Sequence, residues 1–261
     1  MGNFAENMRI LASGGFIFIL YIYPLLQFLG VSIEFNILSV TLISVCCYFV
    51  GMIFYIIALP YFVEKSFIII SMDDKYNSKL EKILSVIIYA IFMGRRRNIG
   101  VVIRLKKFLE EQWQNADLDI GKFRGRYILN TIDRLRITAD EKFSSILYDI
   151  YSFFVFDTNL FTIIVSYVCL SLISLPLSAI YNIGIPMLIS PKNKLAFVFF
   201  MASLIIMAII FRRDALISLI NYYDVAFMYM NTDDGKKRLL SILEIVRKYG
   251  PEYLEPYLMV G

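Results

Sequence analysis

The sequence predicts an all-α integral membrane protein: four transmembrane helices in two hairpins, with a helical cytoplasmic domain between them. Three observations lead to this fold class. Apolar residues make up 59% of the 261 residues and charged residues only 18%, whereas soluble domains are about half apolar and a quarter charged. The apolar residues come in four long runs. Between the second and third runs lies a charged interior, 64–157, which holds 16 of the 26 Lys and Arg residues.

The first hairpin is predicted over residues 1–63. Its two apolar runs are Ile10 to Val31 and Phe35 to Val63, and each is long enough for the ~20 residues that cross a bilayer. The first run exceeds the ~7–15 apolar residues of a signal peptide and has no small-residue cleavage site after it. We therefore expect an uncleaved transmembrane helix, and we expect Pro60 to bend or end the second one.

The basic cytoplasmic domain, 64–157, is predicted to begin its regular structure at a capping box, Ser78-Lys79-Leu80-Glu81. Gly94 ends the helix that this box starts. The apolar core of the helix, 83–93, is too short to span a membrane and has basic residues at both ends. It is predicted either to lie in the membrane interface or to be buried in protein.

Three further helical segments complete this domain. Residues 98–113 are amphipathic, and 127–136 form another helical stretch. A second capping box, 138–141, opens a helix that leads toward the membrane at Asp157. The inward face of the first of these segments is expected to consist of Val102, Leu105, Leu109 and Trp113.

The second hairpin, 158–211, has apolar runs at 160–185 and 195–211, and a cytoplasmic helical tail, 212–261, follows. In this tail, Thr232 to Gly235 start a last helix that Gly250 ends. The predicted loop 32–36 has no basic residue, and the loop after the third span has only Lys192 and Lys194. By the positive-inside rule both termini are cytoplasmic, in a multi-pass protein of the inner (plasma) membrane.

One polar face marks the third predicted span. Its residues follow one another at i, i+4, i+7, i+11 and i+15: Tyr167, Ser171, Ser174, Ser178 and Asn182. Such a face in hydrocarbon meets other protein or water. Two interpretations stay open, a pore lining or a helix-packing face held by small hydroxyls, and the packing face is the commoner case.

A basic cluster is the sharpest charge feature, with no acidic residue from Lys82 to Lys107: Arg95, Arg96, Arg97, Arg104, Lys106 and Lys107. The general expectation is attraction to anionic membrane lipids, worth about 1 kcal/mol per basic residue. A site for a phosphate-bearing ligand and a dock for an acidic protein partner are the alternatives. Nucleic acid is not favoured, because no aromatic residues alternate with the basic ones.

Several function classes are excluded by what the sequence lacks. It has no histidine, no Walker or dinucleotide motif and no carboxylate pair clustered as a catalytic set, so we expect no enzyme, no cofactor and no metal. Cys46, Cys47 and Cys169 lie inside predicted spans without metal-site spacing. No predicted span has an internal charged residue, which argues against a proton relay, a voltage sensor or an ion-coupled transporter.

The layout of two membrane hairpins around a cytoplasmic domain is similar to that of flagellar-stator and TolQ/ExbB-type subunits. The Gly- and Thr-rich span motifs of those proteins are absent here, so their motor function is not implied. Size and layout also resemble the small four-helix membrane components of some bacterial antiphage defence systems. That resemblance implies antiviral defence as a setting.

The function expected from these features is a homo-oligomeric membrane pore or membrane-perturbing effector controlled by its cytoplasmic domain. The alternative is a membrane scaffold or sensor subunit that recruits a soluble cytoplasmic protein. Its motivation is that half the chain is predicted to face the cytoplasm with amphipathic helices.

Overall fold

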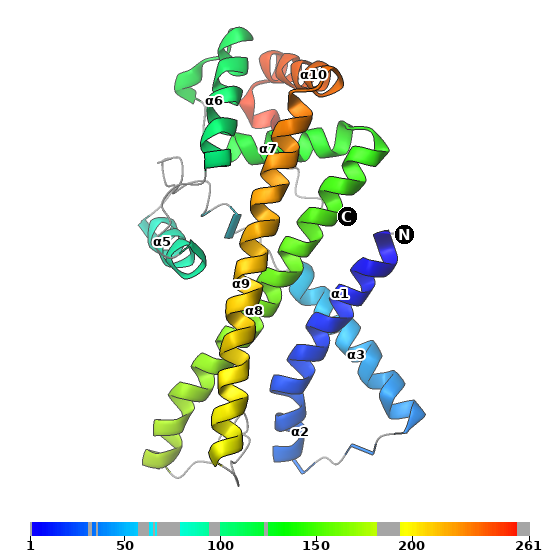
Figure 1. The fold of residues 1–261 in the computed structure, drawn as a ribbon, viewed down its shortest axis with the longest axis vertical. Helices are drawn as coiled ribbons and strands as arrows, with labels where there is room; N and C mark the ends of the chain where they lie inside the picture. The colour runs from blue at the N-terminus through cyan, green and yellow to red at the C-terminus, as the bar shows by residue number, and fades with distance from the viewer. Residues whose placement is uncertain are drawn as a thin grey trace. The chain divides into compact units, whose positions relative to one another are not determined.

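The computed structural model describes residues 2–30, 33–34, 36–56, 63–64, 66, 79–93, 100–122, 125–181 and 194–254. The regular structure in these ranges is helical, with no strand among them (Figure 1). The chain divides into two compact units, each built from two separate segments. Unit 1 is Met1–Pro60 with Ser152–Ala215, and unit 2 is Tyr61–Tyr151 with Leu216–Gly261.

Unit 1 begins with one long helical rod. Helix α1 (Gly2–Ile17), the π-helical turn η1 (Phe18–Ile22) and α2 (Tyr23–Phe28) follow one another with helical backbone angles at both junctions. Leu29 leaves the helical conformation and Gly30 takes a positive φ of 76°, which glycine adopts without steric cost. The rod therefore ends at Phe28, three residues before Val31, the predicted end of the first apolar run.

Helix α3 (Ile37–Ile56) lies against α1 at backbone contact distance. A Cβ atom added to Gly14 would lie 1.6 Å from the carbonyl oxygen of Cys47, and one added to Gly51 would lie 1.9 Å from that of Ile10. Small residues at such positions let two helix backbones approach closely. The neighbouring Gly15 has no such contact, so Gly14 is the residue that this packing requires.

Two long helices contribute to both units: α8 (Glu141–Tyr181) and α9 (Lys194–Met230). Figure 1 draws them in green and in yellow to orange. Within unit 1 the rings of Phe156 and Phe211 are 6.5 Å apart, and those of Tyr167 and Phe200 are 6.4 Å apart. Because the residue number on α9 falls as the residue number on α8 rises from one pair to the next, the two helices run antiparallel.

Two helices of the described chain are long and apolar enough to cross a membrane, judged by length and composition. They are Glu6–Gln27 and Glu141–Ile173, and Ile37–Ile53 is a shorter apolar helix. The first of these covers most of the first predicted span, and the second overlaps the third. The all-helical fold is confirmed for the described residues, while a topology of four crossings remains a prediction.

Unit 2 is built around α6 (Gly100–Asn115) and α7 (Gly125–Thr138), with the single turn η2 (Ile120–Lys122) between them. The four residues predicted to face inward from α6 are between 0% and 3% exposed. Trp113 stacks on Tyr127 of α7 with ring centroids 5.8 Å apart, and Phe108 meets Phe227 of α9 edge-on at 5.6 Å. The amphipathic pattern of the sequence thus sets the core of this unit.

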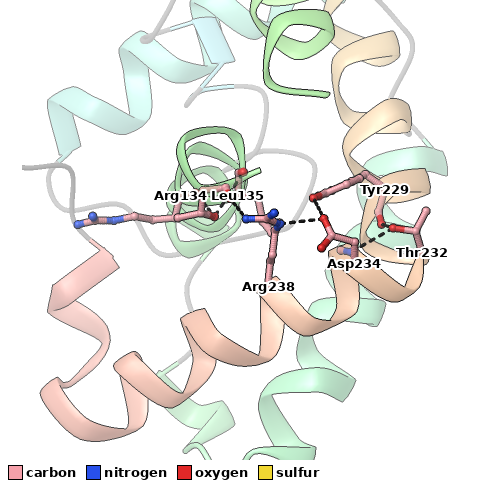
Figure 2. A network of polar contacts seen from close by, with 8 residues as sticks. Arg134, Leu135, Tyr229, Thr232, Asp234 and Arg238 are labelled. Carbon is pink, nitrogen blue, oxygen red and sulfur yellow. Dashed lines mark hydrogen bonds and ion pairs between the residues drawn. The ribbon is translucent and has the colours of Figure 1, made fainter. Parts of the chain in front are cut away.

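A polar network fastens α10 (Asp233–Tyr249) to the end of α9 and to α7 (Figure 2). The Thr232 hydroxyl caps α10 by accepting a 3.1 Å hydrogen bond from its third N–H. Asp234 accepts hydrogen bonds from Tyr229 at 2.6 Å and from Arg238 at 2.8 Å. Arg238 also donates to the last carbonyl of α7, and Arg134 donates to a carbonyl of η3 (Pro251–Leu254) at 3.1 Å. α7, α9, α10 and η3 are thereby joined.

Another helix of unit 2 is α5 (Lys79–Met93), and its bounds agree with the helix predicted between the capping box and Gly94. Its described side chains are exposed, apart from the partly exposed Ile88. The other unit 2 helices bury one face each, so α5 differs from them.

Candidate functional site

The predicted polar face of the third span begins inside unit 1. Tyr167 and Ser171 are each 1% exposed. The Tyr167 ring also meets the Tyr21 ring edge-on at 5.6 Å. Ser174 and Ser178 lie in α8, but their side chains are outside the described set, and Asn182 is outside the described residues. At its first two positions, this face packs within a single chain.

The predicted basic cluster is described only in part. Arg95, Arg96 and Arg97 lie outside the described residues. On α6, the Arg104 side chain is 64% exposed and lies 3.9 Å from the Asp224 carboxylate. Lys106 pairs with Glu110 at 3.8 Å, and Lys107 is exposed. α6 therefore presents a basic face opposite its buried apolar face.

A buried carboxyl cluster in unit 2 is the most unusual chemical feature of the structure. Glu64 is 4% exposed. One of its carboxyl oxygens accepts a 2.6 Å hydrogen bond from the Tyr223 hydroxyl of α9, and the other accepts a 3.2 Å bond from the Tyr151 hydroxyl of α8. A fully buried carboxyl is rare in proteins unless it is paired. Here two tyrosines supply the partners.

The second layer of this cluster is an ion pair on α7. Asp133 and Arg136 lie 3.3 Å apart, with side chains 41% and 24% exposed. Arg136 stands over the Tyr151 ring at 5.5 Å, and Tyr222 lies 5.2 Å from Tyr151, centroid to centroid. The cluster therefore extends from buried Glu64 to partly exposed groups.

The protonation of Glu64 follows from this environment. Burial, with the Asp133 charge as the second cause, raises the pKa of Glu64 from 4.5 to about 8. The hydrogen bonds from Tyr223 and Tyr151 and the positive charge of Arg136 act in the opposite direction. Burial also holds the pKa values of Tyr222 and Tyr223 well above 10. Among Glu64, Tyr222 and Tyr223, only Glu64 has a pKa near neutral pH.

No pattern in the sequence predicts this cluster. Glu64 marks the edge of the charged interior, and nothing local to it indicates a partner. The Tyr223 hydroxyl comes from 159 residues further along the chain. The one usable signal was the isolated carboxylate directly after an apolar run, since burial at that place requires a hydrogen-bonding partner.

A second buried polar group lies in unit 1. The Arg9 guanidinium donates to the Ser152 hydroxyl and stands 3.6 Å from the centre of the Phe153 ring. Asp157 is 8% exposed and Asn159 is 1% exposed. The Asn159 amide has no hydrogen-bond partner among the described residues. Figure 1 shows the two helices that carry these residues, α1 and α8.

No group of three or more metal-ligating side chains occurs among the described residues. Comparisons of the chain with protein-family models, with curated proteins and with solved structures found no match.

Proposed function

We propose that this chain is a homo-oligomeric membrane pore or membrane-perturbing effector controlled by its cytoplasmic domain. The observation that carries the proposal is the course of α8 and α9. Each is one uninterrupted helix with residues in both units, and the chain changes unit after Tyr151 in α8 and after Ala215 in α9. In this proposal the two helices are the covalent connections through which a change in unit 2 reaches unit 1.

The surface of unit 1 supports a bilayer environment. Large apolar side chains are exposed along its helices, whereas a soluble monomer keeps exposed apolar patches small. Among them are Ile37, Leu38, Phe49, Leu172, Ile173, Leu195, Val198, Phe199 and Ile209. The proposed setting is the inner membrane of a bacterium, with both termini cytoplasmic and antiphage defence as the biological context.

The Glu64 cluster supplies a point of control in this proposal. Tyr151 lies on α8 and Tyr223 on α9, and both hydroxyls donate to Glu64. The carboxyl thus joins the unit 2 ends of the two helices that the units share. A change in its charge, or in the segment that carries it, alters how these two helix ends are held.

The first experiment is native mass spectrometry of the complex in mild detergent. A ring of about four or more subunits is expected, because homo-oligomers close by rotational symmetry. A monomer or dimer has too few polar helix faces to line a channel, so that result removes the pore proposal.

The second experiment replaces Ser174 in the polar face by Leu and records conductance in planar bilayers. Tyr167 and Ser171 are buried within one chain, so any lining involves the positions that follow them. Ser174→Leu is expected to change single-channel conductance at least twofold. The control is Ile173→Leu at an exposed apolar position, which should leave conductance unchanged. Equal currents from both variants count against a pore at this face.

The alternative, a scaffold or sensor that recruits a soluble protein, is favoured by the exposed basic face of α6, where Arg104 and Lys107 lie. Reversal of Arg95, Arg96 and Arg97 to Glu is expected to abolish co-purification of the cytoplasmic partner. Reversal of Lys236 and Lys237, both exposed on α10, is the control and should leave it intact. Co-purification that survives the triple reversal places the dock elsewhere.

A further inference from the structure

Helix α5 leaves its apolar side chains uncovered by the rest of the described chain. Five large aliphatic residues on it are between 44% and 57% exposed: Ile83, Leu84, Val86, Ile87 and Ile91. The sequence left two environments open for this helix, the membrane interface and a protein interior. Within one chain, the described residues do not bury α5 in a protein interior.

The helical register of α5 separates two faces. Ile83, Ile87 and Ile91 follow one another at i, i+4 and i+8, and so share one side of the helix. Glu81 and Ser85 occupy the register of the opposite side. The apolar side covers more than half of the circumference, which is broader than the narrow seam of a coiled coil and typical of a helix that lies in a membrane surface.

Length and charge point to the same environment. The 15 residues of α5 give a helix of about 22 Å, shorter than the ~30 Å hydrocarbon core. Lys79 and Lys82 are exposed at its start, and three consecutive arginines, 95–97, follow in the sequence. Glu81 is the one acidic residue between Lys75 and Lys107. A short apolar helix with basic ends is complementary to anionic lipid headgroups.

The chain can also reach such a surface. Fourteen residues, 65–78, separate Glu64 at the end of the second apolar run from Lys79. An extended chain covers roughly 3.3–3.6 Å per residue, so these residues span up to about 45 Å. This connecting length is sufficient for α5 to lie on the bilayer that the second apolar run is predicted to cross.

We propose that α5 lies flat in the interface of an anionic bilayer, with its Ile83–Ile87–Ile91 face at the acyl boundary and with Lys79 and Lys82 at the lipid phosphates. The proposal rests on membrane association of the chain and on neither of the two functions above. It identifies a lipid-binding surface in unit 2, separate from the helices that are long enough to span.

The test uses the full-length protein in lipid nanodiscs, with Cys46, Cys47 and Cys169 replaced by Ser. A single cysteine at position 87 carries an environment-sensitive fluorophore, and a second variant carries it at position 85 on the opposite face. Lipids with a nitroxide quencher high in the acyl chain are expected to quench the label of Ile87→Cys at least threefold more than that of Ser85→Cys. Replacement of phosphatidylglycerol by phosphatidylcholine should reduce this quenching at least twofold.

Three results overturn the proposal. Equal quenching at both positions by nitroxides deep in the bilayer shows a helix that spans. Protection of the labelled Ile87→Cys variant from every lipid quencher, with disulfide cross-linking between subunits of the unlabelled variant on addition of a thiol oxidant, shows an interface with a second copy. Protection without cross-linking, or full access to a water-soluble quencher, shows a helix away from lipid. A third label, at Ile91→Cys, repeats the measurement if the first variant does not purify.

Discussion

Glu64 shows how one side chain acquires properties that its own neighbourhood in the sequence does not indicate. Its carboxyl is buried and hydrogen-bonded to two tyrosines from two different helices. The hydroxyls satisfy the carboxyl oxygens without adding a full positive charge. The carboxyl is therefore held by hydrogen bonds while its pKa stays high, in contrast to a carboxylate paired closely with arginine.

Glu64→Gln tests this description through the pH dependence of stability. The unfolded chain releases the Glu64 proton near pH 4.5 and the folded chain near pH 8. Because the folded state alone keeps the proton in this window, the free energy of unfolding falls as pH rises through it, by about 1.4 kcal/mol per pH unit. The uncharged amide removes this dependence. Glu64→Gln should match wild type at pH 5 and melt at a higher temperature at pH 9.

The control for that measurement is Glu34→Gln, because Glu34 is exposed and its substitution should leave the wild-type pH slope unchanged. Melting temperatures of the detergent-purified protein at pH 5, 7 and 9 give the comparison. If wild type and Glu64→Gln lose stability in parallel, Glu64 does not titrate in this range.

At the scale of an element, the contact between α1 and α3 depends on single glycines. Gly14→Ala places a methyl group where the carbonyl oxygen of Cys47 now lies. Because the obstacle is backbone, the helices must separate, and the cost should reach or exceed the about 1–3 kcal/mol of ordinary overpacking. We expect a lower melting temperature in fluorescence-monitored thermal unfolding.

Gly15→Ala is the matched control, one residue away. Nothing lies within 4 Å of a Cβ atom there, and alanine in a helix is favoured over glycine by about 1 kcal/mol. This variant should therefore melt at the same temperature or higher. Equal destabilisation by both substitutions would mean that the glycine contact does not hold α3 against α1.

The ends of the helices show where local sequence suffices and where it does not. Ser78 and Gly94 predict the bounds of α5, and Thr232 and Gly250 predict those of α10, because a cap acts within one helical turn. Thr138 was predicted to cap α8, but α7 continues through it, and its hydroxyl bonds to the Arg134 carbonyl four residues earlier. A threonine side chain can cap the helix that follows it or bond back to the turn before it. In the folded chain Thr138 bonds back.

The candidate site was predictable only in part, for the same reason. The basic residues of α6 follow from charge counting, and the buried face of α6 follows from its period of 3.6 residues. The partners of Glu64 come from α8 and α9, far along the chain. No local pattern encodes such a pairing, because it depends on how helices distant in sequence come together.

At the scale of the whole molecule, the two units alternate along the chain. Residues 1–60 belong to unit 1, 61–151 to unit 2, 152–215 to unit 1 again and 216–261 to unit 2. Hydropathy divides the chain into membrane-length runs and a polar interior. The helices α8 and α9 nevertheless pass through the points where the chain changes unit.

This alternation has a consequence for how the protein is made. As the chain leaves the ribosome, unit 1 lacks part of itself until Ala215 has been synthesised, and unit 2 lacks α10 until Tyr249 has been. Neither unit can complete its packed core while only its first segment has been synthesised. Glu64 emerges early and meets Tyr223 only after 159 further residues have been added, so until then its carboxyl must stay in water or be bound by a chaperone.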